Sequence, residues 1–198
     1  MDETNFNLHI SRRDGRSIRG SRATSISSGS KGPNVHMIGC IGSLGLIHHE
    51  IRRGSFTKEL AKDWMRTAFR LAREKNASPI VMVIDNAGCH SGIESILLED
   101  EFQDHIFLRL GPYSPMLNPI ETIWSKVKAH VKRNLSSNLQ NLLQNNPENL
   151  PIVEFRLRNL EELMRQSLEV IDISCCVSCI SGVARYFSAA LALEDIIF

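Results

Sequence analysis

Residues 111–133 read GPYSPMLNPIETIWSKVKAHVKR, and this stretch predicts how the rest of the chain is arranged. Pro112 and Pro115 keep its first part extended, because proline fixes φ and has no N–H to give to a strand ladder. Asn118 is a favoured helix N-cap residue, and Pro119 suits the first helical position. The stretch therefore predicts a rigid loop followed by a helix that begins abruptly.

The predicted helix carries two neighbouring stripes of side chains. Apolar residues recur at steps of four, three and four, which is typical of a buried helix face: Ile120, Trp124, Val127 and Val131. The second stripe consists of Glu121, Ser125, Lys128 and Lys132. On local grounds Glu121 completes a capping arrangement with Asn118 and complements the helix dipole. The alternative is a functional carboxylate, which two further acids, Asp2 and Asp85, favour.

The composition is that of an ordinary globular domain: 198 residues, 42% hydrophobic and 23% charged. The formal net charge is +1, so the overall balance predicts no polyanionic partner. The charge is unevenly placed, however, with six basic residues and one acid between His9 and Lys31, and four basic residues and no acid in 122–133. Such stretches can contact phosphates, although a solvated loop is the commoner meaning.

The five cysteines are an odd number scattered through apolar surroundings, which fits a reducing compartment better than a disulfide framework. Cys176-x-x-Cys179 lacks a second pair and a nearby histidine, so buried helical cysteines are favoured over a metal or redox pair. We expect no signal peptide, and no membrane partner, because no apolar run reaches 18 residues.

Strand and helix signals alternate along the rest of the chain. Residues 3–10 alternate between polar and apolar, as in a half-buried strand, and Asp2 has the parity of the apolar side. Runs 35–41 and 44–51, separated by Gly42-Ser43, predict a hairpin. The elements expected next are a helix from 55 or 57 to about 75, a strand at 80–84, a helix at 91–98 and a strand at 106–110.

This order predicts an α/β fold, a ribonuclease H-like mixed sheet with helices on both faces and a C-terminal helical extension. We expect one domain, 1–198, with a core at 1–133, a linker at 134–151 and the helical extension at 152–198. The linker is left open to a short helix at 139–143, and the extension is expected to hold helices at about 154–170 and 174–193.

Three acids are expected to meet at one edge of this sheet. The strand of Asp2 would be central, the strand ending at Asp85 its parallel neighbour, and the helix of Glu121 would lie across both. Charges about 4 Å apart repel by roughly 4 kcal/mol at an effective dielectric near 20, so such a cluster needs a proton or a cation. Oxygen ligands without a histidine or cysteine cage favour Mg²⁺ or Mn²⁺. Glu3 alternates to the other face, so it is not expected to be a primary ligand.

Three segments resemble the acidic motifs of mariner-type DDE transposases. They are Met1-Asp2-Glu3-Thr4-Asn5-Phe6, then Ile84-Asp85-Asn86 with His90, and Pro112-Tyr113-Ser114-Pro115-x-x-Asn118-Pro119-Ile120-Glu121 with Trp124. The 35 residues of 86–120 separate the second and third acids, a spacing within the range of these enzymes. The resemblance extends over nearly the whole chain, to Gly15-Arg16-x-x-Arg19-Gly20 and to the segment from Tyr186-Phe187 to Glu194-Asp195. The third motif is highly specific.

The resemblance implies a metal-dependent DNA endonuclease and strand transferase of a cut-and-paste transposon. By position it implies that Asp2, Asp85 and Glu121 are catalytic and hold two Mg²⁺ or Mn²⁺ ions. Supporting roles in positioning are implied for Asn86, His90 and Asn118, with a hydrogen-bonding role at a helix start equally open for His90. Trp124 is expected in the core.

Double-stranded DNA, as transposon ends and target, is the partner that the resemblance implies, and a homodimer is left open. The candidates for phosphate contacts are the basic residues Arg12, Arg13, Arg16, Arg19, Lys128 and Lys132. The expected location is the nucleus, or the cytoplasm and nucleoid of a bacterial source.

The chain departs from the family at its start. Family members carry an N-terminal helix-turn-helix region that recognises transposon ends, and none precedes Asp2, so a truncated copy is expected. Two alternatives stay open. One is a catalytically inactive remnant that binds DNA or protein, and the other is a ribonuclease H-like nuclease that acts on hybrids or flaps.

Overall fold

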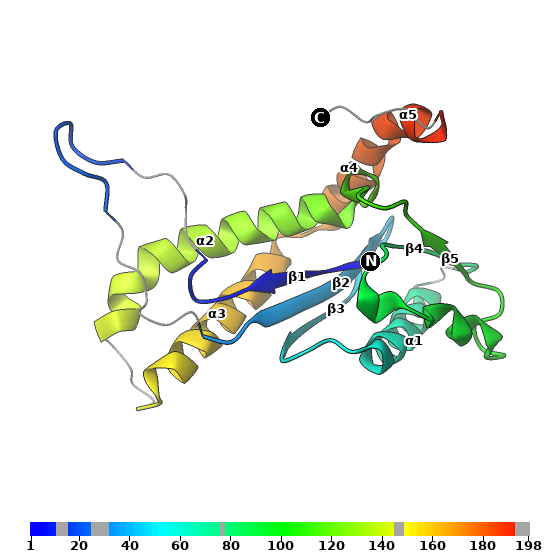
Figure 1. Cartoon of the computed structure of the whole chain (residues 1–198), viewed down its shortest axis with the longest axis horizontal. Helices are drawn as coiled ribbons and strands as arrows, with labels where there is room; N and C mark the ends of the chain where they lie inside the picture. Colours follow the sequence, from blue (N-terminus) through cyan, green and yellow to red (C-terminus); the bar gives the residue numbers. More distant parts are fainter. Residues whose placement is uncertain (11–15, 25–31, 76–77, 145–148, 193–198) are drawn as a thin grey trace.

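The first three strands form an antiparallel meander in a computed structural model that describes residues 1–10, 16–24, 32–75, 78–144 and 149–192 (Figure 1). Strands β1 (Asp2–Phe6), β2 (Val35–Gly42) and β3 (Gly45–Arg53) lie in the order β1-β2-β3. The hairpin between β2 and β3 is as predicted. Asp2 pairs with Gly39 across β1 and β2, which places this acid beside the centre of the longest strand pair.

A second, parallel pair of strands follows, β4 (Val81–Ile84) and β5 (Ile106–Arg109). The prediction that the Asp2 strand is the ladder neighbour of the Asp85 strand is wrong, because β1 and β4 belong to separate sheets. Met1, the residue before β1, contacts β4, where its amine donates to the Val83 carbonyl oxygen at 2.8 Å. From that point β1 runs away from β4 alongside β2, so no ladder forms between them (Figure 1).

Helices cover both faces of the three-stranded sheet. α2 (Ile120–Gln144), α3 (Ile152–Glu169) and α4 (Ile173–Val183) pack on one face, and α1 (Lys58–Glu74) packs on the other (Figure 1). β2 divides its side chains between the two cores, since Val35 and Met37 face α2 whereas Ile38 and Cys40 face α1. This layering is the mixed α/β arrangement that the sequence predicts.

α1 shows why the sequence forms a helix here. Thr57 caps it by accepting from the Leu60 amide at 3.4 Å, and Trp64, Met65 and Phe69 bury one face. The expected helix at 91–98 is instead η2 (Ile93–Leu98), a 3-10 helix after η1 (Gly88–His90). Gly92 between them has φ +74, a left-handed conformation that an α-helix cannot contain.

The C-terminal helices belong to the same core as the sheet. α2 continues through Gln144, into the predicted linker, and the expected helix at 174–193 divides into α4, the 3-10 turn η4 (Ala184–Tyr186) and α5 (Phe187–Leu191). Among the described residues, Ile173–Leu191 is one stretch that is long and apolar enough to cross a membrane. A single stretch of this kind is weak evidence for a span. Within it, α4 buries Cys176 and Cys179 against the α2 core.

α2 lies very close to the sheet at Gly39. A Cβ built on Gly39 would lie 2.9 Å from Cη2 of Trp124 and 3.6 Å from Cδ1 of Ile120. Both side chains come from the predicted apolar stripe and are fully buried. Glycine at this position therefore lets the first turns of α2 lie directly on the strand pair that carries Asp2.

We predict that Gly39→Ala lowers the free energy of unfolding by about 1–3 kcal/mol, because the added methyl group forces Trp124 off the sheet. Chemical denaturation measures this change. Gly182→Ala in α4 is the matched control, since nothing lies within 4 Å of its Cβ position. It should leave stability unchanged or raise it by up to about 1 kcal/mol. Equal effects of the two substitutions would contradict the close-packing argument.

Candidate active site

The three acids singled out by the sequence line one cleft. Asp2 lies at the start of β1, Asp85 directly after β4, and Glu121 in the first turn of α2. The cleft has a volume of about 470 Å³, and its opposite wall is the loop 110–115. Three segments far apart in the sequence thus bring their carboxylates to a single concave surface.

Asp2 is held in place through the backbone of the preceding residue, Met1. The Met1 amine binds the Val83 carbonyl, and the Asn118 side-chain amide donates to the Met1 carbonyl oxygen at 3.3 Å. Asp2 itself is only 8% exposed. Burial, followed by the negative charge of Glu121, raises the pKa of Asp2 to about 7.

Asp85 is fixed by the turn that follows β4. Its Oδ1 accepts from the Ala87 amide at 3.1 Å and lies 2.8 Å from Nδ1 of His90. The other ring nitrogen of His90, Nε2, lies 2.8 Å from Oε1 of Glu3. Burial by itself lowers the pKa of His90, but the contacts with Cys89 and Glu3 outweigh it and raise this pKa to about 10. His90 is therefore a fully buried bridge between two carboxylates.

Arg109 at the end of β5 braces the same turn, and sequence reasoning missed it. Its guanidinium donates to the His90 carbonyl oxygen at 2.6 Å and to Glu94 at 2.5 Å. Asn86 supports the turn from the other side by donating to the Leu110 carbonyl oxygen at 2.7 Å. The only sequence signal for Arg109 was a charged residue that ends a short apolar strand.

Asn118 differs from its predicted role as a side-chain cap. Its backbone amide donates to the Pro115 carbonyl and its backbone carbonyl accepts from the Glu121 amide at 3.2 Å, so the reciprocal capping arrangement with Glu121 is not formed. Its side-chain Oδ1 is buried and has no hydrogen-bond partner among the residues that the structure describes. Asn118 is one of the residues that line the cleft with the three acids.

The donor set of the cleft fits a hard divalent cation. Its three carboxylates offer oxygen ligands, which Mg²⁺ and Mn²⁺ prefer. Burial raises the pKa of Asp2 most, and the negative charge of Glu121 raises it further, so both effects favour a bound proton or cation at this carboxylate. The residues that could hold such an ion are Asp2, Asp85 and Glu121, with Asn118 beside them.

The loop before α2 forms an exposed lip of the cleft. Tyr113 is 98% exposed and has φ +55, a left-handed conformation that is rare for a bulky residue. The 3-10 turn η3 (Pro115–Leu117) then leads into α2. A strained, solvent-facing aromatic ring beside the acids is a surface on which a nucleobase can stack.

The predicted phosphate contacts are placed unevenly. Arg16 and Arg19 are exposed, and the described segment 16–24, which contains them, lies beyond the end of α2 that is remote from β4 (Figure 1). Lys128 and Lys132 are half-buried further along α2 and line no part of the cleft. Arg12 and Arg13 lie outside the described residues.

A basic groove that the sequence did not predict continues from the cleft. It has a volume of about 640 Å³ and shares Pro115, Asn118 and Glu121 with the cleft. Its walls include Lys126 of α2 and Arg185, whose guanidinium lies 4.7 Å from the ring centre of Tyr186. Finding this groove required knowing that α4 and α5 pack beside the start of α2.

Comparison with known proteins identifies the class. The family described as DDE superfamily endonuclease matches residues 1–143, so the chain belongs to this family. No curated protein sequence matches the chain.

The solved structures that the chain resembles include several of the mariner Mos1 transposase. They include the Mos1 paired-end complex with Mg (TM-score 0.67, 15% identity, 99% of this chain and 55% of that chain). The Mos1 paired-end complex with the left transposon end is also similar (TM-score 0.54, 18% identity, 94% of this chain and 55% of that chain). So is the Mos1 catalytic domain with Raltegravir and Mg (TM-score 0.55, 14% identity, 83% of this chain and 77% of that chain).

These likenesses confirm the ribonuclease H-like fold predicted from the sequence. The chain spans about half the length of the Mos1 chains in the paired-end complexes.

We predict that Asp2 makes the stability of the metal-free protein depend on pH. Its folded pKa of about 7 lies above its unfolded value, so the folded state is favoured below about pH 4 and loses stability as pH rises toward 7. Asp2→Asn removes this loss, because asparagine does not titrate. Urea unfolding in EDTA measures the free energy of unfolding from pH 4 to pH 8. Relative to the wild type, this free energy should increase for Asp2→Asn as pH rises, by up to a few kcal/mol at about 1.4 kcal/mol per pKa unit.

Asp100→Asn is the control, because Asp100 is exposed and is not one of the residues that line the cleft. It should follow the wild type at every pH. If the difference in unfolding free energy between Asp2→Asn and the wild type is the same at every pH, Asp2 does not have a raised pKa in the folded protein.

Proposed function

We propose that this chain is the catalytic part of a cut-and-paste transposase, a metal-dependent DNA endonuclease and strand transferase. The observation that carries the proposal is the convergence of Asp2, Asp85 and Glu121 on one cleft. Membership of the DDE superfamily endonuclease family supports it, as does the likeness of the fold to Mos1 transposase.

The proposed cofactors are two Mg²⁺ or Mn²⁺ ions, held by the three carboxylates. When bound, such ions activate a water or a 3′-hydroxyl and stabilise the departing oxygen of a phosphodiester. Mos1 paired-end complexes have been solved with Mg and with Mn, which supports this choice of metal for the related fold.

The other residues of the cleft orient the acids. His90 and the Ala87 amide both hold Oδ1 of Asp85, which leaves Oδ2 for the cleft. Asn118 fixes the backbone of Met1 and so the direction of Asp2. Glu121 is positioned by the helix itself, because Ile120 and Trp124 on either side of it are anchored in the core. Such preorganisation matters because small displacements of catalytic groups are costly in rate.

The proposed substrate is double-stranded DNA, as transposon ends and as target. The groove beside the cleft, with Lys126 and Arg185, suits a phosphate backbone that leads toward the acids. The Mos1 relatives are described as paired-end and strand-transfer complexes, which supports DNA ends as partners and a second copy of the chain. The nucleus, or the nucleoid of a bacterial source, is the location that this substrate requires.

We predict that Glu121→Gln abolishes Mn²⁺-dependent nicking of duplex DNA while the protein stays folded. Loss of a direct metal ligand should cost at least about 100-fold, since supporting residues alone cost about 10–100-fold. Nicking of supercoiled plasmid and circular dichroism measure the two properties. Glu169→Gln, at the exposed end of α3, is the control and should nick like the wild type.

The same assay separates the alternatives. Cleavage of RNA–DNA hybrids with none of duplex DNA would favour a ribonuclease H-like nuclease. Absence of any response to Mn²⁺ or EDTA, in activity and in melting temperature, would favour an inactive remnant. If Glu121→Gln unfolds, the role of Glu121 is structural, at the start of its helix.

We predict that Lys126→Ala and Arg185→Ala each weaken DNA binding across all sequences and reduce the salt slope by about 1. Lys128→Ala and Lys132→Ala should have smaller effects, since both residues lie outside the groove. Fluorescence anisotropy with a short duplex at several salt concentrations measures the change. Arg165→Ala on α3 is the charge-matched control. A greater loss from the Lys128 and Lys132 variants would move the DNA path along α2.

A further inference from the structure

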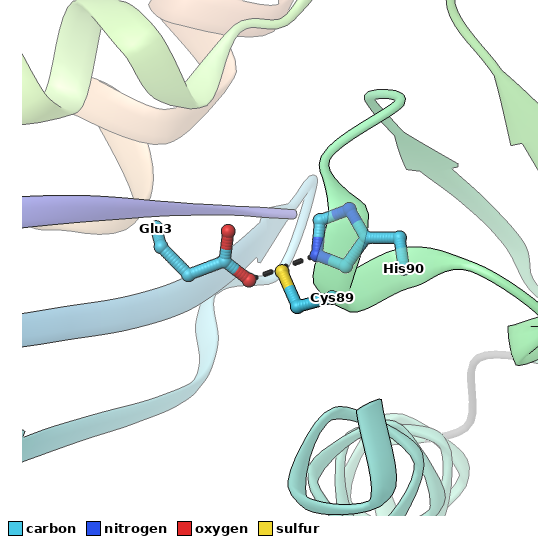
Figure 2. Close-up of side chains that lie close together, drawn as sticks. All are labelled: Glu3, Cys89 and His90. Atoms are coloured by element: carbon cyan, nitrogen blue, oxygen red, sulfur yellow. Dashed lines mark hydrogen bonds and ion pairs between the residues drawn. The ribbon is translucent and has the colours of Figure 1, made fainter. Parts of the chain in front are cut away.

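A group of metal-binding side chains lies on the opposite side of β1 from the acidic cleft. Successive residues of a strand point to opposite faces, so Glu3 points away from the side that carries Asp2. It meets Cys89 and His90, which belong to η1 after β4 (Figure 2). Figure 2 shows the carboxylate, the thiol and the imidazole turned toward one another.

The distances suit a single small cation. One oxygen of Glu3, the Cys89 sulfur and a ring nitrogen of His90 all lie within 4.8 Å of one another. Ligand atoms around a tetrahedral Zn²⁺ lie about 3.3–3.8 Å apart, which follows from Zn–N, Zn–O and Zn–S bonds of about 2.0–2.3 Å. The 2.8 Å contact between Nε2 of His90 and Glu3 would have to open slightly, and the rest need not move far.

His90 already has the orientation of a zinc ligand. Its Nδ1 contacts Asp85, so Nε2 is the nitrogen that faces Glu3 and Cys89. A carboxylate on the far nitrogen of a liganding histidine is the usual support for zinc, because it fixes the ring and strengthens the donor. The backbone of His90 is fixed independently by Arg109. Glu3 is 14% exposed in its side chain, so its charge lies largely out of water without an arginine or lysine partner among the described residues.

We propose that Glu3, Cys89 and His90 form a zinc site that is separate from the acidic cleft. One thiolate, one imidazole and one carboxylate are a zinc set and not a magnesium set, since sulfur is a poor ligand for hard ions. Three protein ligands leave the fourth position to water. The cation joins β1 to the turn after β4 and, through His90, restrains Asp85 on the other side of the turn.

The test is binding of Zn²⁺, and of Co²⁺ as its coloured substitute, to the full chain purified free of metal. We expect one Zn²⁺ per chain by isothermal titration calorimetry, and a thiolate-to-Co²⁺ charge-transfer band in the near ultraviolet. Cys89→Ala should remove the band and weaken Zn²⁺ binding at least about tenfold. Glu3→Gln should weaken binding but keep the band, because the thiolate remains.

Two controls make the outcome specific. Cys175→Ala must keep the band, because Cys175 lies with Cys176 and Cys179 on α4, the other place where thiols gather. Glu121→Gln must also keep it, so a failure of the proposed cleavage function leaves this result unaffected. A band that survives in Cys89→Ala, or is lost in Cys175→Ala, overturns the proposal, as does the absence of Zn²⁺ binding to the wild type.

Discussion

The contact of α2 with β2 at Gly39 is the constraint on which the rest of the structure depends. Trp124 and Ile120 lie against a strand position that has no side chain, so the first turn of α2 reaches the level of Asp2. Because Glu121 lies between these two anchors, its carboxylate faces the cleft, and no hydrogen bond from the described residues holds it there. Apolar packing, and not polar attraction, therefore brings the acids together.

That packing works against the electrostatics of the cleft. Asp2 is mostly buried and close to Glu121, so its pKa rises to about 7, and the metal-free protein keeps this arrangement at a cost in stability. The cores on both faces of the sheet supply the compensating free energy, with Trp124, Phe6 and Phe69 among the largest fully buried side chains. Packing thus brings the acids together before any cation binds. The cluster does not need a cation in order to form.

The sequence predicted the parts of the site that follow from local patterns and from motifs. The parity of Asp2 on its strand, the position of Asp85 after an apolar strand and that of Glu121 at a helix start all matched the arrangement seen in the cleft. It did not predict that β1 and β4 belong to separate sheets, because a hydropathy pattern indicates where strands occur but not which strands pair. Nor did it predict the groove with Lys126 and Arg185, which depends on tertiary packing of helices far apart in the chain.

The turn after β4 connects the two faces of β1. On one face Asp85 points into the acidic cleft, and on the other His90 meets Glu3, with the bond between Asp85 and His90 joining them. Arg109 and Asn86 hold the turn from β5 and its end, so it has little freedom to reorient. A change in the charge around His90 must therefore act on Asp85 through their shared hydrogen bond, since the backbone cannot absorb it. The orientation of Asp85 is set as much by the buried His90 behind it as by the cleft in front.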